Sequence, residues 1–216
     1  MFGNSVFDHA GSLILGHSVC KSRVEELDET RIRGYRKYDE RLRKAMSGLR
    51  VTAPSLSYSE NTLLNLLEKE VELLHPPAAH TRGDTMIILP DDGVLFAGYV
   101  VWEAYHPNLE DADVGGWISA LRRIERMRVK AVVPGHGRVT GRRSATRLSR
   151  YIAWFDQKMR EAAARKTMPE EAVEELRVPD TEKWNLKMII KRNVDILLPW
   201  YKRVFEKRAQ SGSQKS

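Results

Sequence analysis

The chain of 216 residues contains little of several residue types that mark particular classes of protein. Its one cysteine, Cys20, excludes an internal disulfide and a cysteine-rich zinc site. We expect this thiol to be buried or idle, because no partner for a nucleophile stands beside it in the sequence. Aromatic residues make up 8% of the chain, and none interleaves with the basic residues between 120 and 150, so base stacking is not expected in that segment.

Long apolar runs are absent as well, and none reaches the length of a membrane span. The first eleven residues, M-F-G-N-S-V-F-D-H-A-G, lack the basic and then apolar pattern of a secretory signal. No internal repeat is visible. We therefore expect a soluble, cytoplasmic protein with no membrane partner, although sequence upstream of Met1 could carry a targeting signal.

Apolar residues at 42% and charged residues at 30% are typical of a globular protein, and this length is ample for one core. Hydrophobic periodicity predicts strands and then helices, hence an α/β (α+β) fold in which helices cover a sheet. We expect one domain over residues 1–168 and a helical appendage with a frayed tail over 169–216. The expected strands are 12–17, the alternating run E-K-E-V-E-L-L-H, the hairpin D-T-M-I-I-L-P and G-V-L-F-A-G-Y-V-V-W, and K-A-V-V; the expected helices are 21–47, 113–128, 144–165, 169–176 and 183–207.

The net charge of +7 is concentrated between residues 120 and 150. One interpretation is a face that attracts phosphates or another polyanion. The other is a pair of solvated helix faces that lie near one another. The segment contains Arg122, Arg123, Arg126, Arg128, Lys130, Arg138, Arg142, Arg143, Arg147 and Arg150, with Glu125 as its one acidic residue.

Two of the six histidines, His80 and His136, stand in settings typical of metal sites. His80 lies in the loop A-A-H-T-R-G-D ahead of a hairpin, and His136 ends the run V-V-P-G-H-G beside a buried strand. Loops on the rim of a rigid sheet are where metal sites are commonly built. We expect the other four, His9, His17, His75 and His106, to be partly buried or to cap helices.

The run H-T-R-G-D-T-M-I-I-L-P-D-D-G-V-L-F-A-G, followed by a helix with a central Trp and then V-V-P-G-H-G, resembles the metallo-β-lactamase superfamily of metallohydrolases. The resemblance covers residues 60–165 well, and residues 2–60 more loosely. It implies a four-layer αββα sandwich, here incomplete, that holds zinc at the edge of its sheets. It also implies that His80 and His136 are metal ligands, and that Asp84 is a buried Asp that supports them.

The chain departs from the family pattern at two places. It contains no His-x-His-x-Asp-His, and Gly3-Asn4 matches a pair that commonly follows that motif in relatives. Met1 is therefore expected to be a misassigned start or the start of a truncated gene. Tyr99 stands where the family has a metal-bridging Asp, and a free phenol, with a pKa of about 10, is a poor zinc ligand.

The expected function follows from this ligand set. A catalytic zinc needs about three protein ligands and an open position for water, which the metal acidifies. The resemblance implies zinc-hydroxide attack on an ester, thioester, amide or similar bond of a small molecule, and we expect zinc to be weakly held or absent and the activity impaired. The alternative is a non-catalytic binding or assembly module with a basic face, for which nucleic acid is the less favoured partner. An unpaired sheet edge predicts self-association.

Overall fold

The computed structural model describes residues 3–26, 40–45, 47–48, 50–176 and 181–213. The chain divides into two units, residues 1–62 and 63–216, each of which is described by itself. The boundary predicted after residue 168 stays a prediction. No described helix has both the length and the apolar character needed to cross a membrane.

The first unit is a small two-stranded parallel sheet with short helices. Strand β1 (Leu15–His17) pairs with β2 (Leu56–Tyr58), and the ring of His17 packs edge-on against Tyr58 at 5.4 Å between centroids. Strand β2 lies within V-T-A-P-S-L-S-Y-S, residues 51–59, whose composition predicts a turn, and that prediction is wrong over β2. A parallel partner about forty residues away in sequence stabilises a strand that local turn-forming residues do not predict.

Short helices complete this unit: α1 (Asn4–His9), α2 (Ser18–Glu25) and α4 (Glu40–Ala45). The family resemblance over residues 2–60 implies a helix, a strand and a helix, and α1 is the first of these. His17 ends β1 and caps α2, since its Nδ1 accepts a hydrogen bond from the backbone N–H of Val19 at 3.3 Å. The single long helix expected over residues 21–47 is thus α2 and α4 in part, and residues 27–39 lie outside the described residues.

The second unit is a five-stranded mixed sheet in the order β3-β4-β5-β6-β7. The strands expected from alternation and from the hairpin pattern are confirmed. The strands are β3 (Thr62–Leu66), β4 (Lys69–Leu74), β5 (Met86–Leu89), β6 (Val94–Trp102) and β7 (Ala131–His136). β4 and β5 pair antiparallel, as do β5 and β6, whereas β6 and β7 are parallel, as expected for strands joined by a helix.

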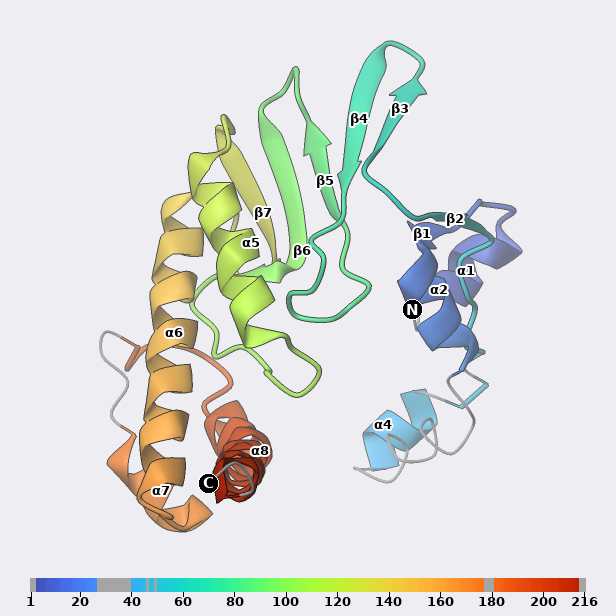
Figure 1. Ribbon diagram of the computed structural model, residues 1–216. Coiled ribbons are helices and arrows are strands. Elements are labelled where there is room, and N and C mark those ends of the chain that lie inside the picture. The colour runs from blue at the N-terminus through green and yellow to red at the C-terminus, as the bar shows by residue number, and fades with distance from the viewer. Residues whose placement is uncertain (1–2, 27–39, 46, 49, 177–180, 214–216) are drawn as a thin grey trace. The chain divides into compact units, whose positions relative to one another are not determined.

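Helices α5 (Val114–Arg126) and α6 (Arg143–Ala164) pack against each other and against β6 (Figure 1). Apolar residues at helical spacing on both helices form the core with the inner face of the sheet. The largest fully buried members include Trp117, Leu121, Ile124, Leu148, Ile152 and Phe155. The α/β class with C-terminal helices, predicted from the sequence, is confirmed.

Helices α7 (Pro169–Glu175) and α8 (Met188–Ser213) continue the packing, α8 against α6 and α7 against α8. The aromatic residues of the last helical segment are predicted to be core contacts rather than a ligand site. Trp184 and Tyr201 are buried in the core and Phe205 packs against it, but Trp200 is 48% exposed, so the prediction is wrong for Trp200. A buried asparagine, Asn193, ties α8 to the loop after β6. Its side chain accepts from the N–H of Leu109 at 2.9 Å and donates to the carbonyl of Pro107 at 2.8 Å.

Candidate metal centre

His80 lies in a loop that is held rigidly between β4 and β5. Asp84 accepts two hydrogen bonds from Thr81, one from its backbone N–H at 2.8 Å and one from its hydroxyl at 2.9 Å. The ring of His75 bonds the carbonyl of Asp84 at 2.8 Å. Asp84 therefore fixes the residue next to His80 without a hydrogen bond to the imidazole itself.

The same loop is pinned to the start of α5. The N–H of Asp113 donates to the carbonyl of Ala79 at 3.0 Å, and the Asp113 carboxylate caps the helix by accepting from the N–H of Gly116 at 2.7 Å. A Cβ on Gly116 would lie 2.3 Å from the carbonyl oxygen of Ala78, so only glycine permits this approach. Trp117 packs edge-on against His80 at 5.2 Å and donates its indole N–H to Val100 at 2.8 Å.

His136 is the last residue of β7 and is placed by the register of the parallel pair β6–β7. Phe96 pairs with Val133, Gly98 with Pro134 and Trp102 with His136, so β6 contains extra residues that bulge from the ladder. Gly98 has a φ of 51°, which favours glycine. The bulges bring Tyr99 and Trp102 together beside His136.

The two histidines contact the same pair of aromatic side chains. The ring of Tyr99 is 5.2 Å from that of His80 and 5.0 Å from that of His136, and it stacks on the latter. The ring of Trp102 is 5.7 Å from His80 and 4.2 Å from His136. The ring of Tyr105 lies 5.4 Å from that of His136. The structure thus brings three of the expected site residues, His80, Tyr99 and His136, into one aromatic cluster.

Burial keeps both imidazoles neutral at pH 7. Desolvation lowers the pKa of His80, and nearby His136 lowers it further, whereas the charges of Asp84 and Asp111 raise it. Desolvation also lowers the pKa of His136. A neutral imidazole has a lone pair to offer a metal. The buried Nδ1 of His80 has no hydrogen-bond partner among the described residues, which leaves that nitrogen open to a ligand.

Three residues near His80 or His136 were not predicted from the sequence as part of the site. Trp102 and Tyr105 follow the strand that carries Tyr99, and their role depends on the bulged register of β6. Asp111 acts on His80 from the loop before α5, and its signal in the sequence is the acidic run N-L-E-D-A-D. An acidic run alone is an ordinary feature of a solvated loop, so the sequence did not single it out.

The residues present do not fit a catalytic zinc ion. Within the described parts of the chain, no three His, Cys, Asp or Glu side chains are grouped closely enough to hold a metal. A catalytic zinc needs about three such ligands and an open position. Here the rings of Tyr99 and Trp102 pack against both His80 and His136, and Tyr99 stands where a carboxylate is expected.

Comparison with known proteins agrees with this fold. The profile of the metallo-β-lactamase superfamily matches residues 7–136, which is more than half of the chain, and the protein belongs to that superfamily. Its members have a hydrolase-type fold and typically use zinc.

Solved structures of metallo-β-lactamases resemble the chain in fold at low sequence identity. The enzyme from Pontibacter korlensis superposes with a TM-score of 0.53 at 17% identity, with 70% of this chain and 62% of that chain covered. VMB-1 superposes with a TM-score of 0.51 at 17% identity, with 70% of this chain and 61% of that chain covered. The DIM-1 metallo-β-lactamase exposed to ceftazidime superposes with a TM-score of 0.53 at 15% identity, with 70% of this chain and 61% of that chain covered. The chain therefore spans about three fifths of the length of these relatives.

Proposed function

We propose that this protein is a metallo-β-lactamase-fold hydrolase whose zinc-hydroxide chemistry, directed at an ester, thioester, amide or similar bond of a small molecule, is impaired in the chain as it stands. The observation that carries the proposal is the contact of Tyr99 and Trp102 with both imidazoles. A phenol stands where a bridging carboxylate is expected, and an indole packs beside it. The fold is kept, and the ligand set is incomplete.

Two features support a centre that derives from a metal site. The first is the neutral, partly desolvated state of His80 and His136, which suits ligands rather than ion-pair partners. The second is the unpartnered Nδ1 of His80 among the described residues. Buried polar atoms normally have a hydrogen-bond partner, so a buried nitrogen without one needs an explanation. The loss of a metal ion that this nitrogen would bind provides one.

Zinc binding by the full chain and by the variants Tyr99→Asp and Tyr99→Phe tests the proposal. Equilibrium dialysis followed by metal analysis should give well under one tightly held zinc per native chain. Tyr99→Asp replaces the phenol ring that packs against both imidazoles by a carboxylate, so zinc affinity should rise at least about tenfold. Tyr99→Phe keeps the ring and should bind zinc as weakly as the native protein does.

Hydrolysis of chromogenic ester, thioester and lactam substrates completes the test. The native chain should show no zinc-dependent turnover above background, because no water-activating ion is held. One firmly bound zinc per native chain together with turnover would refute the proposal. Equal zinc affinity in Tyr99→Asp and Tyr99→Phe would show that the aromatic ring is not what weakens the site.

A further inference from the structure

The basic segment between residues 120 and 150 covers the second half of α5, all of β7 and the first turns of α6. All ten of its arginine and lysine side chains are exposed, and it contains a single acidic residue, Glu125. Part of this charge lies near His136, because Arg147 pairs with Glu103, whose N–H donates to the His136 carbonyl, and part lies at the other end of β7. Lys130 immediately precedes β7, whereas His136 ends that strand, so the two mark opposite ends of β7.

Most of these cations have no counter-charge. Arg147 forms an ion pair with Glu103, and Arg142 donates to the backbone carbonyl of Glu125 at 3.1 Å. None of the other eight forms an ion pair with any described residue. Elsewhere in the second unit, six cations form ion pairs: Lys69–Asp92, Lys158–Glu161, Arg160–Asp156, Arg165–Glu175, Lys191–Asp195 and Arg192–Glu110. Others, such as Lys183, Lys187 and Arg203, form none with a described residue, so the segment is distinguished by its density of exposed cations, ten against one acidic residue. A surface of this kind attracts external anions.

Two hollows open on this segment. The larger, of about 580 Å³, is lined by Lys130, Arg142 and Arg143 with Thr140, Gly141 and Thr146, among others. The smaller, of about 320 Å³, is lined by Ser119 and three arginines of α5, Arg122, Arg123 and Arg126. We call the six cations that line the hollows the basic face: Arg122, Arg123, Arg126, Lys130, Arg142 and Arg143.

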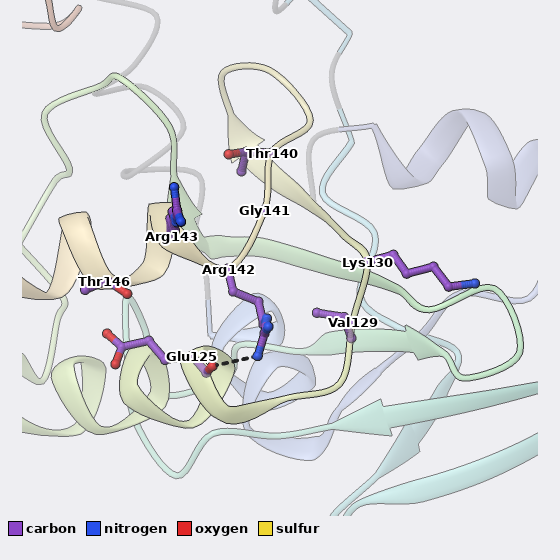
Figure 2. A pocket seen from close by; sticks show the side chains of 8 residues that line it. All are labelled: Glu125, Val129, Lys130, Thr140, Gly141, Arg142, Arg143 and Thr146. Atoms are coloured by element: carbon purple, nitrogen blue, oxygen red, sulfur yellow. Dashed lines mark hydrogen bonds between the residues drawn. The ribbon is translucent and has the colours of Figure 1, made fainter.

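The side chains of the basic face do not converge on one point. Figure 2 shows Lys130, Arg142 and Arg143 pointing in three different directions from the rim of the larger hollow. A single small anion is bound by donors that converge, whereas a chain of phosphates is bound by cations spread along a surface. The geometry of the basic face suits the second kind of ligand.

The chemistry of the face suits phosphates. Five of its six cations are arginines, whose planar guanidinium groups bind phosphate oxygens in a bidentate manner. Helix α6 begins at Arg143 with no side-chain cap and no acidic residue in its first turn, so its positive end adds to the field. The segment has one exposed large apolar side chain, Val139, which is too little for insertion into a membrane.

We propose that the basic face binds the phosphate backbone of a nucleic acid without sequence preference. The face offers no aromatic side chain on which a base could stack, so contacts would be to the backbone alone. Binding of this type falls steeply with salt, with a slope of about −0.9 per phosphate neutralised on duplex DNA. The proposal does not depend on the metal chemistry of the aromatic cluster.

Fluorescence anisotropy with a labelled mixed-sequence DNA duplex, measured between about 50 mM and 200 mM salt, tests the proposal. The full chain should bind, and the triple variant R122Q/R123Q/R126Q should lose at least about tenfold in affinity and lower the salt slope by up to about 3. The matched control, K191Q/R192Q/K202Q, removes the same charge from exposed or partly exposed positions of α8 and should bind within about twofold of the native chain.

The outcomes separate the proposal from its alternatives. Equal weakening by both triple variants would overturn it in favour of a general effect of net charge. No binding to the duplex at the lowest salt, or retention only by vesicles that contain phosphatidylserine, would also overturn it. Circular dichroism melting of the variants distinguishes lost binding from lost fold, and Tyr99→Asp should bind the duplex as the native chain does.

Discussion

At the scale of the residue, Asp84 shows how a side chain acts on a site that it does not touch by hydrogen bond. Its two carboxylate oxygens accept from the N–H and the hydroxyl of Thr81, and the hydroxyl in turn accepts from the N–H of Gly83 at 3.2 Å. These bonds define the turn that follows His80. The charge of Asp84 also reaches His80, where it opposes the lowering of the pKa by desolvation.

Replacing Asp84 by Ala should therefore destabilise the protein. Two donors of Thr81 lose their acceptor in a partly buried loop, and we expect the free energy of unfolding to fall by about 1–3 kcal/mol, as measured by urea unfolding. Asp92→Ala is the matched control, because Asp92 only forms an exposed ion pair with Lys69 and should cost less than about 1 kcal/mol. Equal losses in the two variants would contradict this role of Asp84.

His106 is a second residue whose protonation is set by its surroundings. It is 1% exposed, its Nδ1 lies 3.0 Å from the hydroxyl of Tyr151, and its backbone N–H donates to Asn185. Burial, and then the charge of Lys187, lower its pKa to about 4. Burial also raises the pKa of Tyr151, so both partners of this hydrogen bond are neutral at pH 7.

This shift predicts a loss of stability in acid. The pKa of His106 in the folded state lies below its ordinary value of 6.5. The stability that the neutral imidazole contributes is therefore complete above pH 6.5 and is lost as the pH falls towards about 4. The difference corresponds to about 3 kcal/mol. Urea unfolding at pH 7 and pH 4 measures the free energy of unfolding, which should fall less between the two pH values in His106→Gln than in the native chain. Equal losses in both proteins would contradict the prediction.

At the scale of the element, the register of the pair β6–β7 determines which side chains contact the two histidines. The bulged register turns Tyr99 towards His136, and Gly135 lets the ring lie close to β7. A Cβ on Gly135 would lie 2.3 Å from Cδ1 of Tyr99 and 2.8 Å from the backbone of Gly98. The glycine of P-G-H-G thus serves packing in this chain as well as the turn.

Gly135→Ala should cost about 1–3 kcal/mol of stability, because an added methyl group in a tight contact forces its neighbours to move. In a Tyr99→Ala background the cost should be smaller, since one of the two clashes is gone and only the contact with Gly98 is left. Urea unfolding of the four proteins in a double-mutant cycle measures the coupling. Fully additive effects would show that Tyr99 and Gly135 do not contact each other in solution.

At the scale of the whole molecule, β3 is an unpaired edge within the described part of the second unit. It pairs with β4 on one side only, and two of its leucines, Leu63 and Leu66, are 51% and 55% exposed. Leu67, which turns the chain into β4, is fully exposed with a φ of 57°. An exposed edge with apolar side chains is a template for pairing with a second copy of the same chain.

We therefore expect concentration-dependent self-association of the native chain in sedimentation velocity experiments. The variant L63K/L66K places charges on the edge and should sediment as a monomer over the same range. Leu13 and Leu15 are exposed leucines outside β3. The control variant L13K/L15K adds the same charge as L63K/L66K and should associate as the native chain does. A native chain that sediments as a monomer at every concentration would contradict the expectation.

The sequence by itself determined the order of strands and helices in the second unit and the family to which the chain belongs. Alternation, helical spacing and the P-D-D-G turn are local signals, and they are read correctly because each acts within a few residues. The same local view missed β2, whose partner lies far along the chain, and did not separate the exposed Trp200 from its buried neighbours.

Only the tertiary structure decided how the site and the surface are composed. The sequence placed His80, Tyr99 and His136 in one family pattern, but the bulges of β6 bring Tyr99 and Trp102 against both imidazoles. The sequence likewise showed a basic segment, whereas the structure showed that its ten cations are exposed and that one of them, Arg147, forms an ion pair with a described residue. Register and ion pairing join residues distant in sequence, and they are fixed by packing that no local pattern encodes.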